Sequence, residues 1–325
     1  MELRRRAFLR LAAGTALLPA LSPIAHAEGY PSRPVRLVVG FAPGGGNDIV
    51  ARLMAQWLSD RLGQQFIVEN RPGAGTNIAA EFVITSAADG YTLLLAGVPN
   101  AVNATLYHKL SFNFMRDTTP IVAVANVPNV MVINPSFPAK TLKDFIAYAK
   151  ANPGKVNMAS PGIGSGGHLS GELFKYMAGV DLTHVPFRGN GPALTALLGG
   201  QVDVLFPPIA ASIKYIEGGQ LVGLGVTSAK RAETLPQIPA IGEVVPGYAM
   251  VAWYGFSGPK GTPAEVVDTI NKQVNAALAD PQIKARLADL GATLMGGSPA
   301  DFGKYIADET EKWAKVIPAA HMTAD

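Results

Sequence analysis

Two glycine-rich stretches contain the residues whose types and spacing best fit ligand binding. The first, SPGIGSGGHL, covers residues 160–169, after a strand-like run at 155–159 and before a helical pattern at 169–178. Glycine lets backbone N–H groups approach a ligand closely, and a helix N-terminus adds unpaired donors and the positive end of the helix dipole. Such a loop favours an anion.

The second stretch, FAPGGGND, covers residues 41–48 and connects a predicted strand to a predicted helix. Its three successive glycines can take positive φ and expose N–H groups, and Asn47 or Asp48 can cap the helix. A tight strand-to-helix turn is the simpler alternative. If the two stretches face one cleft, they can hold a carboxylate without any Arg or Lys.

A dinucleotide-binding enzyme is the main competing interpretation of the first stretch. Gly162, Gly164 and Gly167 have the G-x-G-x-x-G spacing between a strand and a helix, and Asp181 follows further along. However, His168 stands where helix packing favours an apolar residue. Asp181 also precedes the next predicted strand rather than ending one. Both features weigh against a dinucleotide site.

Other chemistry has little support in the sequence. Ser165 lacks the upstream glycine of the G-x-S-x-G hydrolase motif, because Ile163 stands there. The chain has no cysteine, and its histidines lack metal-ligand spacing. We therefore expect a protein that is not an enzyme, with no cofactor and no metal site.

The N-terminal segment has the three parts of an export signal. A basic run at 4–10 precedes an apolar run at 11–24 and an A-x-A cleavage pattern at 25–27, so residues 1–27 are predicted to be removed. Residues 5–9 (RRAFL) resemble a twin-arginine signal. This segment also accounts for the basic excess of 27 Lys and Arg over 24 Asp and Glu. We expect a periplasmic protein exported by the twin-arginine route, with no nucleic-acid partner.

Short β-branched runs alternate with helical patterns along the rest of the chain, which predicts an α/β fold with mostly parallel sheets flanked by helices. The predicted strands are 35–41, 66–69, 92–96, 121–124, 129–133, 156–159, 183–185, 202–206, 221–227 and 251–257. The predicted helices are 48–62, 75–87, 101–107, 142–151, 169–178, 191–198, 212–217, 263–279, 281–290 and 299–316. Extended segments near 121–133 and 245–257 suggest two crossing strands between two lobes, with a ligand cleft between the lobes.

Ten short motifs follow one another over almost the whole mature length. Among them are Phe41-x-Pro43-Gly44-Gly45-x-x-Asp48, Ser160-x-Gly162-x-Gly164-Ser165-x-x-His168-Leu169 and Trp253-x-Gly255. Together they resemble the periplasmic receptors of tripartite tricarboxylate transporters, called Bug receptors. The resemblance implies a two-lobed flytrap fold, with 28–125 plus 247–325 in lobe 1 and 126–246 in lobe 2. It also implies a receptor, expected to be a monomer, that captures a small carboxylated solute and delivers it to integral membrane transporter subunits.

The resemblance further implies the ligand contacts, since backbone amides, hydroxyls and bridging waters hold the carboxylate in this family. One side of the cleft would consist of Ala42, Gly44, Gly45, Asn47 and Asp48; the other would consist of Gly164, Ser165 and His168, with Asn100 and Trp253 near the rim. A capping or packing role remains open for His168, and a place in the core remains open for Trp253 and Tyr254.

The chain departs from the family pattern at Pro207, where an Asp is frequent. Since an Asp could pair with a ligand amine, its replacement favours a carboxylate without a free amine, either dicarboxylic or aromatic. Two alternative functions remain open. One is a secreted dinucleotide-dependent enzyme that uses Gly162, Gly164 and Gly167, and the other is a ligand sensor for a signalling membrane partner.

Overall fold

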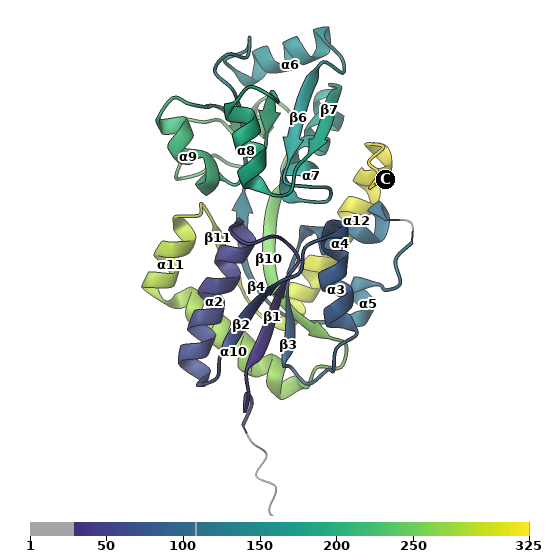
Figure 1. The fold of residues 1–325 in the computed structure, drawn as a ribbon, viewed down its shortest axis with the longest axis vertical. Coiled ribbons are helices and arrows are strands. Elements are labelled where there is room, and N and C mark those ends of the chain that lie inside the picture. The colour runs from purple at the N-terminus through teal and green to yellow at the C-terminus, as the bar shows by residue number, and fades with distance from the viewer. Residues whose placement is uncertain (1–28, 108, 325) are drawn as a thin grey trace, which may run out of the picture.

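Two β-sheets, each flanked by helices, divide the chain into two lobes (Figure 1). The structure is a computed structural model that describes residues 29–107 and 109–324. The predicted export signal lies outside the described residues. Within them, no helix is both long enough and apolar enough to cross a membrane. The two-lobed α/β architecture predicted from the sequence is confirmed.

The first lobe is built on a six-stranded sheet in the order β11-β4-β10-β3-β1-β2. Its strands are β1 (Val35–Val39), β2 (Phe66–Asn70), β3 (Thr92–Gly97), β4 (Thr118–Pro128), β10 (Val251–Pro259) and β11 (Thr293–Gly296). Strand β1 is parallel to β2 and β3, whereas β10 is antiparallel to β3 and β4, and β11 is antiparallel to β4. The sheet is therefore mixed rather than mostly parallel. Strand β10 starts at the hinge and runs away from the hinge, opposite to its neighbours β3 and β4.

The second lobe has a five-stranded sheet in the order β7-β6-β8-β5-β9. Its strands are β5 (Val130–Ile133), β6 (Val156–Ser160), β7 (Leu182–Pro186), β8 (Val204–Leu205) and β9 (Val222–Val226). Strand β6 is parallel to β7 and β8, but β5 is antiparallel to β8 and β9. This sheet is mixed for the same reason, since β5 comes directly from the hinge.

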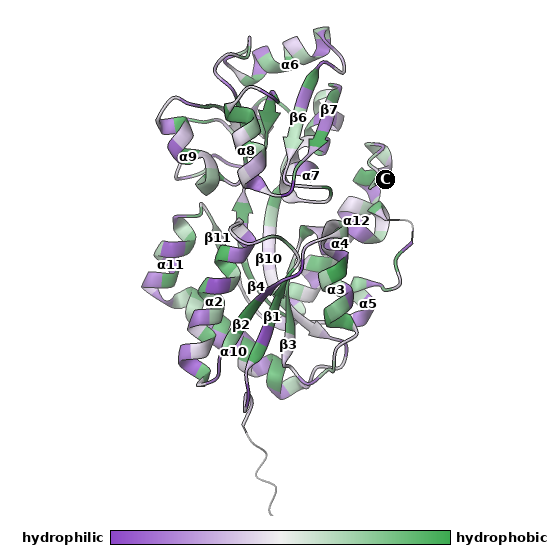
Figure 2. Cartoon of the chain, viewed as in Figure 1, coloured by the Kyte–Doolittle hydropathy of each residue, from purple (hydrophilic) through white to green (hydrophobic). Residues whose placement is uncertain are grey.

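Helices cover both faces of each sheet. In the first lobe they are α2 (Gly46–Leu62), η1 (Ala74–Thr76), α3 (Asn77–Ile84), α4 (Val98–Leu106), α5 (Phe114–Asp117), α10 (Ala264–Ala279), α11 (Pro281–Ala288) and α12 (Pro299–Ala319). In the second lobe they are α6 (Leu142–Ala151), α7 (Gly166–Ala178), α8 (Asn190–Leu198), α9 (Ile209–Glu217) and η2 (Ile241–Glu243). Helices such as α2 and α10 alternate between hydrophilic and hydrophobic residues (Figure 2), as expected for helices with one face on a core.

The strands of the first lobe have nearly continuous apolar sequences because both faces of the sheet are buried. In β1, Val35, Leu37 and Val39 belong to the cluster under α2 and α10, while Val38 belongs to the cluster on the opposite face. Side chains of a strand alternate between faces, so a strand covered on both sides is apolar at nearly every position.

The chain first crosses between the lobes where β4 passes into β5, and Asn129 is the single residue between these two strands. The backbone of Thr227 donates to the carbonyl of Asn129 (2.9 Å), and its side-chain hydroxyl accepts from the N–H of Asn129 (2.9 Å). The N–H of Met250, just before β10, donates to the carbonyl of Thr227 (2.8 Å). The two predicted crossing strands thus lie side by side and are linked by hydrogen bonds at the hinge.

Candidate ligand-binding cleft

A cleft of about 980 Å³ lies between the lobes. Most of its wall consists of loops that leave the end of a strand and lead into a helix, the place where α/β folds bind ligands. The wall is formed by residues 40–47, 72–76, 94–100, 161–163, 165–167 and 186–192, with Tyr107, Asn129, Pro208, Ala252 and Tyr254.

Four helices begin on the wall of this cleft. The first residues of α2 and α4 come from the first lobe, and those of α7 and α8 come from the second. Helices α4, α7 and α8 have no acidic residue in their first turn, so the positive ends of their dipoles are not neutralised there. The backbone N–H groups of Gly46 and Gly166 have no acceptor among the described residues. The cleft therefore offers donors to an anion from both sides.

The charged residues of the wall also favour an anionic ligand. Among the described wall residues, Arg188 is the only charged one, and no Asp or Glu is present. The wall thus combines one cation with several positive helix ends. A ligand ammonium group would find no carboxylate partner on it.

Asn100 lines the wall and carries a buried amide donor that has no acceptor in the described part of the chain. It occupies the first turn of α4, and its Oδ1 accepts a hydrogen bond from the N–H of Gly97 (2.9 Å). The residue is 94% buried, and its Nδ2 is shielded from solvent with no hydrogen-bond partner among the described residues. A buried amide donor without a partner is costly, at about 1–3 kcal/mol, and an acceptor in the cleft would remove that cost.

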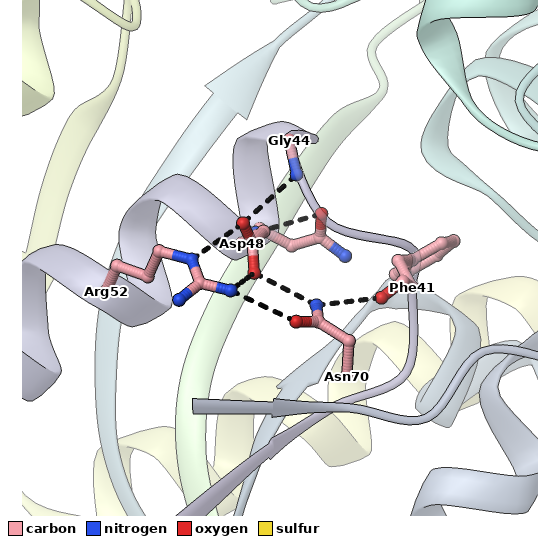
Figure 3. Close-up of polar contacts among 6 residues, drawn as sticks. Phe41, Gly44, Asp48, Arg52 and Asn70 are labelled. Carbon is pink, nitrogen blue, oxygen red and sulfur yellow. Dashed lines mark hydrogen bonds and ion pairs between the residues drawn. The ribbon is translucent and has the colours of Figure 1, made fainter. Parts of the chain in front are cut away.

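The carboxylate of Asp48 organises the loop that precedes α2 (Figure 3). It accepts hydrogen bonds from the backbone N–H of Gly44 (3.0 Å), from Arg52 (2.9 Å) and from Nδ2 of Asn70 (2.9 Å). Burial alone would raise the pKa of Asp48, but these three hydrogen bonds outweigh it and lower that pKa. Asp48 is therefore ionised and turned inward, and the N–H of Gly44 is already used within the loop.

An equivalent arrangement fixes the loop of the second lobe. The N–H of Gly164 donates to Nδ1 of His168 (3.2 Å), and the N–H of Gly162 donates to the hydroxyl of Ser160 (3.2 Å). Helix α7 begins at Gly166 rather than at the predicted Leu169, because the hydroxyl of Ser165 accepts from the N–H of His168 (3.3 Å) and caps the helix. This earlier start brings the first turn of α7 to the cleft.

Two histidine rings in contact with each other pack beside this loop. The rings of His168 and His184 lie 4.2 Å apart, and the hydroxyl of Ser160 lies 2.6 Å from Nε2 of His184. Burial, followed by the charge of His184, lowers the pKa of His168 to about 3; burial, followed by the charge of Lys175, lowers that of His184 to about 4. The carboxylate of Glu172 lies 3.9 Å from His168 but is paired with Lys175 (2.9 Å). Both histidines are therefore neutral at neutral pH.

This neutrality makes stability depend on pH. The unfolded chain protonates His168 near its ordinary pKa of about 6.5, while the folded chain resists protonation down to about 3. The unfolded state thus binds more protons in that window, so stability must fall as pH decreases. From pH 7.5 to pH 5, we expect His168 alone to lower the free energy of unfolding by about 2 kcal/mol. Urea unfolding at both pH values measures this change.

The variant His168→Gln should show a smaller pH-dependent loss, since its side chain does not titrate. His321→Gln, at an exposed position near the C-terminus, is the matched control and should keep the slope of the unmodified protein. An unchanged slope in His168→Gln would contradict the assignment of a buried neutral histidine.

Strand β10 presents Tyr254, not Trp253, to the cleft. Trp253 is fully buried and packs edge-on against Phe302 and Tyr305, with ring centroids 5.8 Å apart in both pairs. Tyr254 lies on the wall, and its hydroxyl has no hydrogen-bond partner among the described residues. A methyl group built on Gly46 would lie 3.6 Å from that hydroxyl, which places it beside the start of α2. Burial raises the pKa of Tyr254, so the hydroxyl stays a donor.

The sequence-predicted site residues therefore divide into two sets. Those on the cleft wall are Ala42, Gly44, Gly45, Asn47, Asn100 and Ser165. Those off the wall are Asp48, Gly164, His168 and Trp253, which are engaged in the loop networks or the core. The reason is tertiary packing: the carboxylate of Asp48 and the ring of His168 are turned toward their own loops.

Two wall segments were not predicted as part of the site. Residues 72–76 follow β2, and residues 186–192 extend from the end of β7. Both contain paired glycines between a strand and a helix, the same signal that identified the first two loops. In the 72–76 segment, φ is positive at Gly73, Ala74, Gly75 and Thr76 in succession. Positive φ is rare for a β-branched residue such as Thr76, whose Cβ packs against Gly40.

The dinucleotide interpretation conflicts with the geometry of the second lobe. The acidic residue of such a site belongs at the carboxyl end of a strand, near the glycine loop. Asp181 instead precedes β7, and its carbonyl accepts from the N–H of Gly154, which lies before β6. Asp181 is therefore at the end of the sheet opposite the glycine loop. Among the described residues, no group of three or more His, Cys, Asp or Glu could hold a metal ion.

Comparisons with known proteins identify the family of this chain. Residues 50–322 match the sequence profile described as tripartite tricarboxylate transporter family receptor. The protein BugT of Bordetella pertussis is 37% identical over 294 residues, which are 90% of this chain and 90% of that protein. The chain belongs to this receptor family. It is therefore a solute-binding receptor and not an enzyme, and the dinucleotide alternative has no support.

Solved structures of similar proteins show the same fold. The structure of R. palustris Rpa4515 with adipate has a TM-score of 0.86 and 38% identity, covering 90% of this receptor and 99% of that chain. MatC (Rpa3494) from Rhodopseudomonas palustris with bound malate has a TM-score of 0.83 and 33% identity, covering 89% and 100%. The periplasmic binding protein BugD has a TM-score of 0.84 and 34% identity, covering 90% and 99%.

Proposed function

We propose that this receptor captures a small carboxylate without an amine in the cleft between its lobes and delivers it to membrane subunits of a tripartite tricarboxylate-type transporter. The observation that carries the proposal is the buried, unpartnered Nδ2 of Asn100 on a wall where four helices begin. Similar receptors with adipate and with malate support the carboxylate class. The family supports the periplasm as the compartment.

Several donors would share the carboxylate. From the first lobe we propose Asn100, the hydroxyl of Tyr254, and the backbone of Gly45 and Gly46 together with Asn47; from the second, the first turn of α7 after Ser165. Each hydrogen bond to a charged group contributes about 1.5–3 kcal/mol, so three or four suffice for micromolar affinity after the cost of association. Asp48 and His168 support this set by holding the loops in place.

The charge of the cleft wall is the reason for proposing a ligand without an amine. No Asp or Glu lines the cleft among the described residues, and Pro208, next to the unusual Pro207, contributes an apolar surface there. An ammonium group would be desolvated beside positive helix ends and Arg188 without a counter-charge. Such a group costs several kcal/mol unless it is paired.

Calorimetry with matched acids tests this proposal. Succinate and aspartate differ by one ammonium group, as do glutarate and glutamate, while the spacing of the carboxylates is the same. We expect each amine-free acid to bind at least tenfold more tightly than its amino-acid counterpart. Tight binding of aspartate or glutamate, with none of the amine-free acids, would overturn the proposal.

We also propose the lobe boundaries 28–125 plus 247–325 and 126–246, a monomer in solution, and export by the twin-arginine route. The hydrogen bonds among Asn129, Thr227 and Met250 mark where the chain passes between the sheets, and they lie a few residues after both proposed boundaries, because β4 continues in the first sheet as far as Pro128. The mass of the exported protein in analytical ultracentrifugation tests whether it is a monomer in solution. Replacing the residues Arg5 and Arg6 by lysines tests the export route, since a twin-arginine substrate would then stay in the cytoplasm.

A further inference from the structure

Arg188 is the one charged side chain on the described wall of the cleft. It is exposed, and it forms no ion pair or hydrogen bond with any described residue. An arginine without a partner in a cleft that holds anions is available for a ligand carboxylate, which its planar guanidinium can bind with two parallel hydrogen bonds.

The backbone on both sides of Arg188 is fixed to the glycine loop of the second lobe. The N–H of Phe187 donates to the carbonyl of Ser160 (2.9 Å), and the N–H of Gly189 donates to that of Pro161 (3.0 Å). Helix α8 begins immediately after, at Asn190, and adds its own positive end on the same segment. The backbone position of Arg188 is therefore set by the same loop that presents α7, while its side chain is free to extend toward a ligand.

Arg188 lies away from the donors at the hinge. It follows β7, the edge strand of its sheet, which is three strand spacings from the hinge strand β5, or about 14 Å. Tyr254 lies on the other hinge strand and pairs with Gly97, next to the helix that carries Asn100. The cleft thus has a hinge pole, formed by Asn100 and Tyr254, and an edge pole, formed by Arg188 with the start of α8.

The rest of the wall is mostly apolar. Ile163, Phe187, Leu94 and Leu95 contribute to it, together with several prolines and alanines of the wall. With a volume of about 980 Å³, the cleft is much larger than a single carboxylate requires. Because the long Arg188 side chain can extend from the edge pole toward the hinge, it covers part of this separation. A short aliphatic chain with a carboxylate at each end would then place one charge on the guanidinium, the other at the hinge pole, and its methylene groups between them.

We infer that Arg188 is a specificity-determining residue that binds the second carboxylate of a linear dicarboxylate and so selects diacids over monoacids. The inference rests on the proposed function, since it takes the first carboxylate to be held at the hinge pole. It adds a named residue and a charge requirement that the family membership does not supply.

The test compares diacids with monoacids of equal carbon number, with adipate and hexanoate as the first pair, in calorimetry at fixed ionic strength. In the unmodified receptor the diacid should bind more tightly. In Arg188→Gln its affinity should fall about 10- to 100-fold, whereas hexanoate affinity should stay within about twofold. Arg188→Lys should retain part of the preference, because it keeps the charge but loses the bidentate geometry.

Lys155→Gln is the matched control. It removes one exposed cation from the same lobe, before β6 and outside the cleft, and should leave the affinities for both acids unchanged. An equal loss for both acids in Arg188→Gln, or no loss for either, would overturn the role of Arg188. If the unmodified receptor binds no carboxylate at all, the proposed function itself fails, and the two failures are thereby distinguished.

Discussion

Asn100→Asp is expected to abolish most ligand binding while leaving the fold intact. The carboxylate that replaces the amide keeps an oxygen for the N–H of Gly97, so the cap of α4 is preserved. It replaces the unpartnered Nδ2 donor by a negative oxygen at the point where the ligand carboxylate is proposed to bind. Loss of a charge-assisted hydrogen bond and repulsion of like charges together predict a loss of affinity of at least 100-fold at pH 7.5.

The ligand-free Asn100→Asp variant should remain folded but be less stable than the unmodified receptor. An acidic residue in the first turn of a helix interacts favourably with the dipole, typically by 0.3–1 kcal/mol. However, the new carboxylate is buried without a counter-charge and its desolvation outweighs that gain, so we expect a lower melting temperature for the ligand-free variant than for the unmodified receptor. Gln201→Glu makes the same chemical change at an exposed site outside the cleft and should bind normally. Unchanged affinity in Asn100→Asp would contradict the proposed site.

Trp253→Ala is expected to destabilise the receptor by about 3–5 kcal/mol in urea unfolding. The indole is fully buried and packs against Phe302 and Tyr305 of α12, so its loss leaves a large cavity between the hinge strand and that helix. Because Trp253 does not line the cleft, any effect on ligand affinity should be indirect and smaller than the effect on stability.

Tyr254→Phe, one position along the strand, should lower ligand affinity more than it lowers stability. The hydroxyl it removes has no protein partner, so stability should stay within about 0.5 kcal/mol. Affinity for the carboxylate should fall about tenfold, because one donor to the ligand is lost. If Tyr254→Phe bound normally and Trp253→Ala retained full stability, the assignment of the two aromatic residues would be reversed.

The contrast between Trp253 and Tyr254 shows a limit of sequence reasoning. Residues along a strand alternate between its faces, so a single step in register decides which aromatic ring reaches the ligand. The sequence locates strand 251–257 and the two aromatic residues on it, but it contains no information on which face meets α12. Pairing with β3 and β4 fixes that choice.

The order and type of most elements could be predicted, because short β-branched runs and helical patterns are local signals. The direction of β10 and the presence of β11 could not. Strand β11 covers only Thr293–Gly296 and ends in a glycine, and it exists because β4 offers it an edge for pairing. Such strands depend on a partner far away in the sequence, which local propensity does not describe.

The sequence by itself determined the two-lobed α/β fold, the receptor family and the two glycine loops that begin α2 and α7. These follow from local signals: glycines between a strand and a helix, capping residues, and ten motifs in order. Only the tertiary structure decided which donors are free. It ties Gly44 to Asp48 and Gly164 to His168, and it leaves three side-chain groups of the wall without partners in the part of the protein that the structure describes: Nδ2 of Asn100, the hydroxyl of Tyr254 and the guanidinium of Arg188. The physical reason is that a hydrogen-bonding group is available to a ligand only when the packing around it provides no other partner.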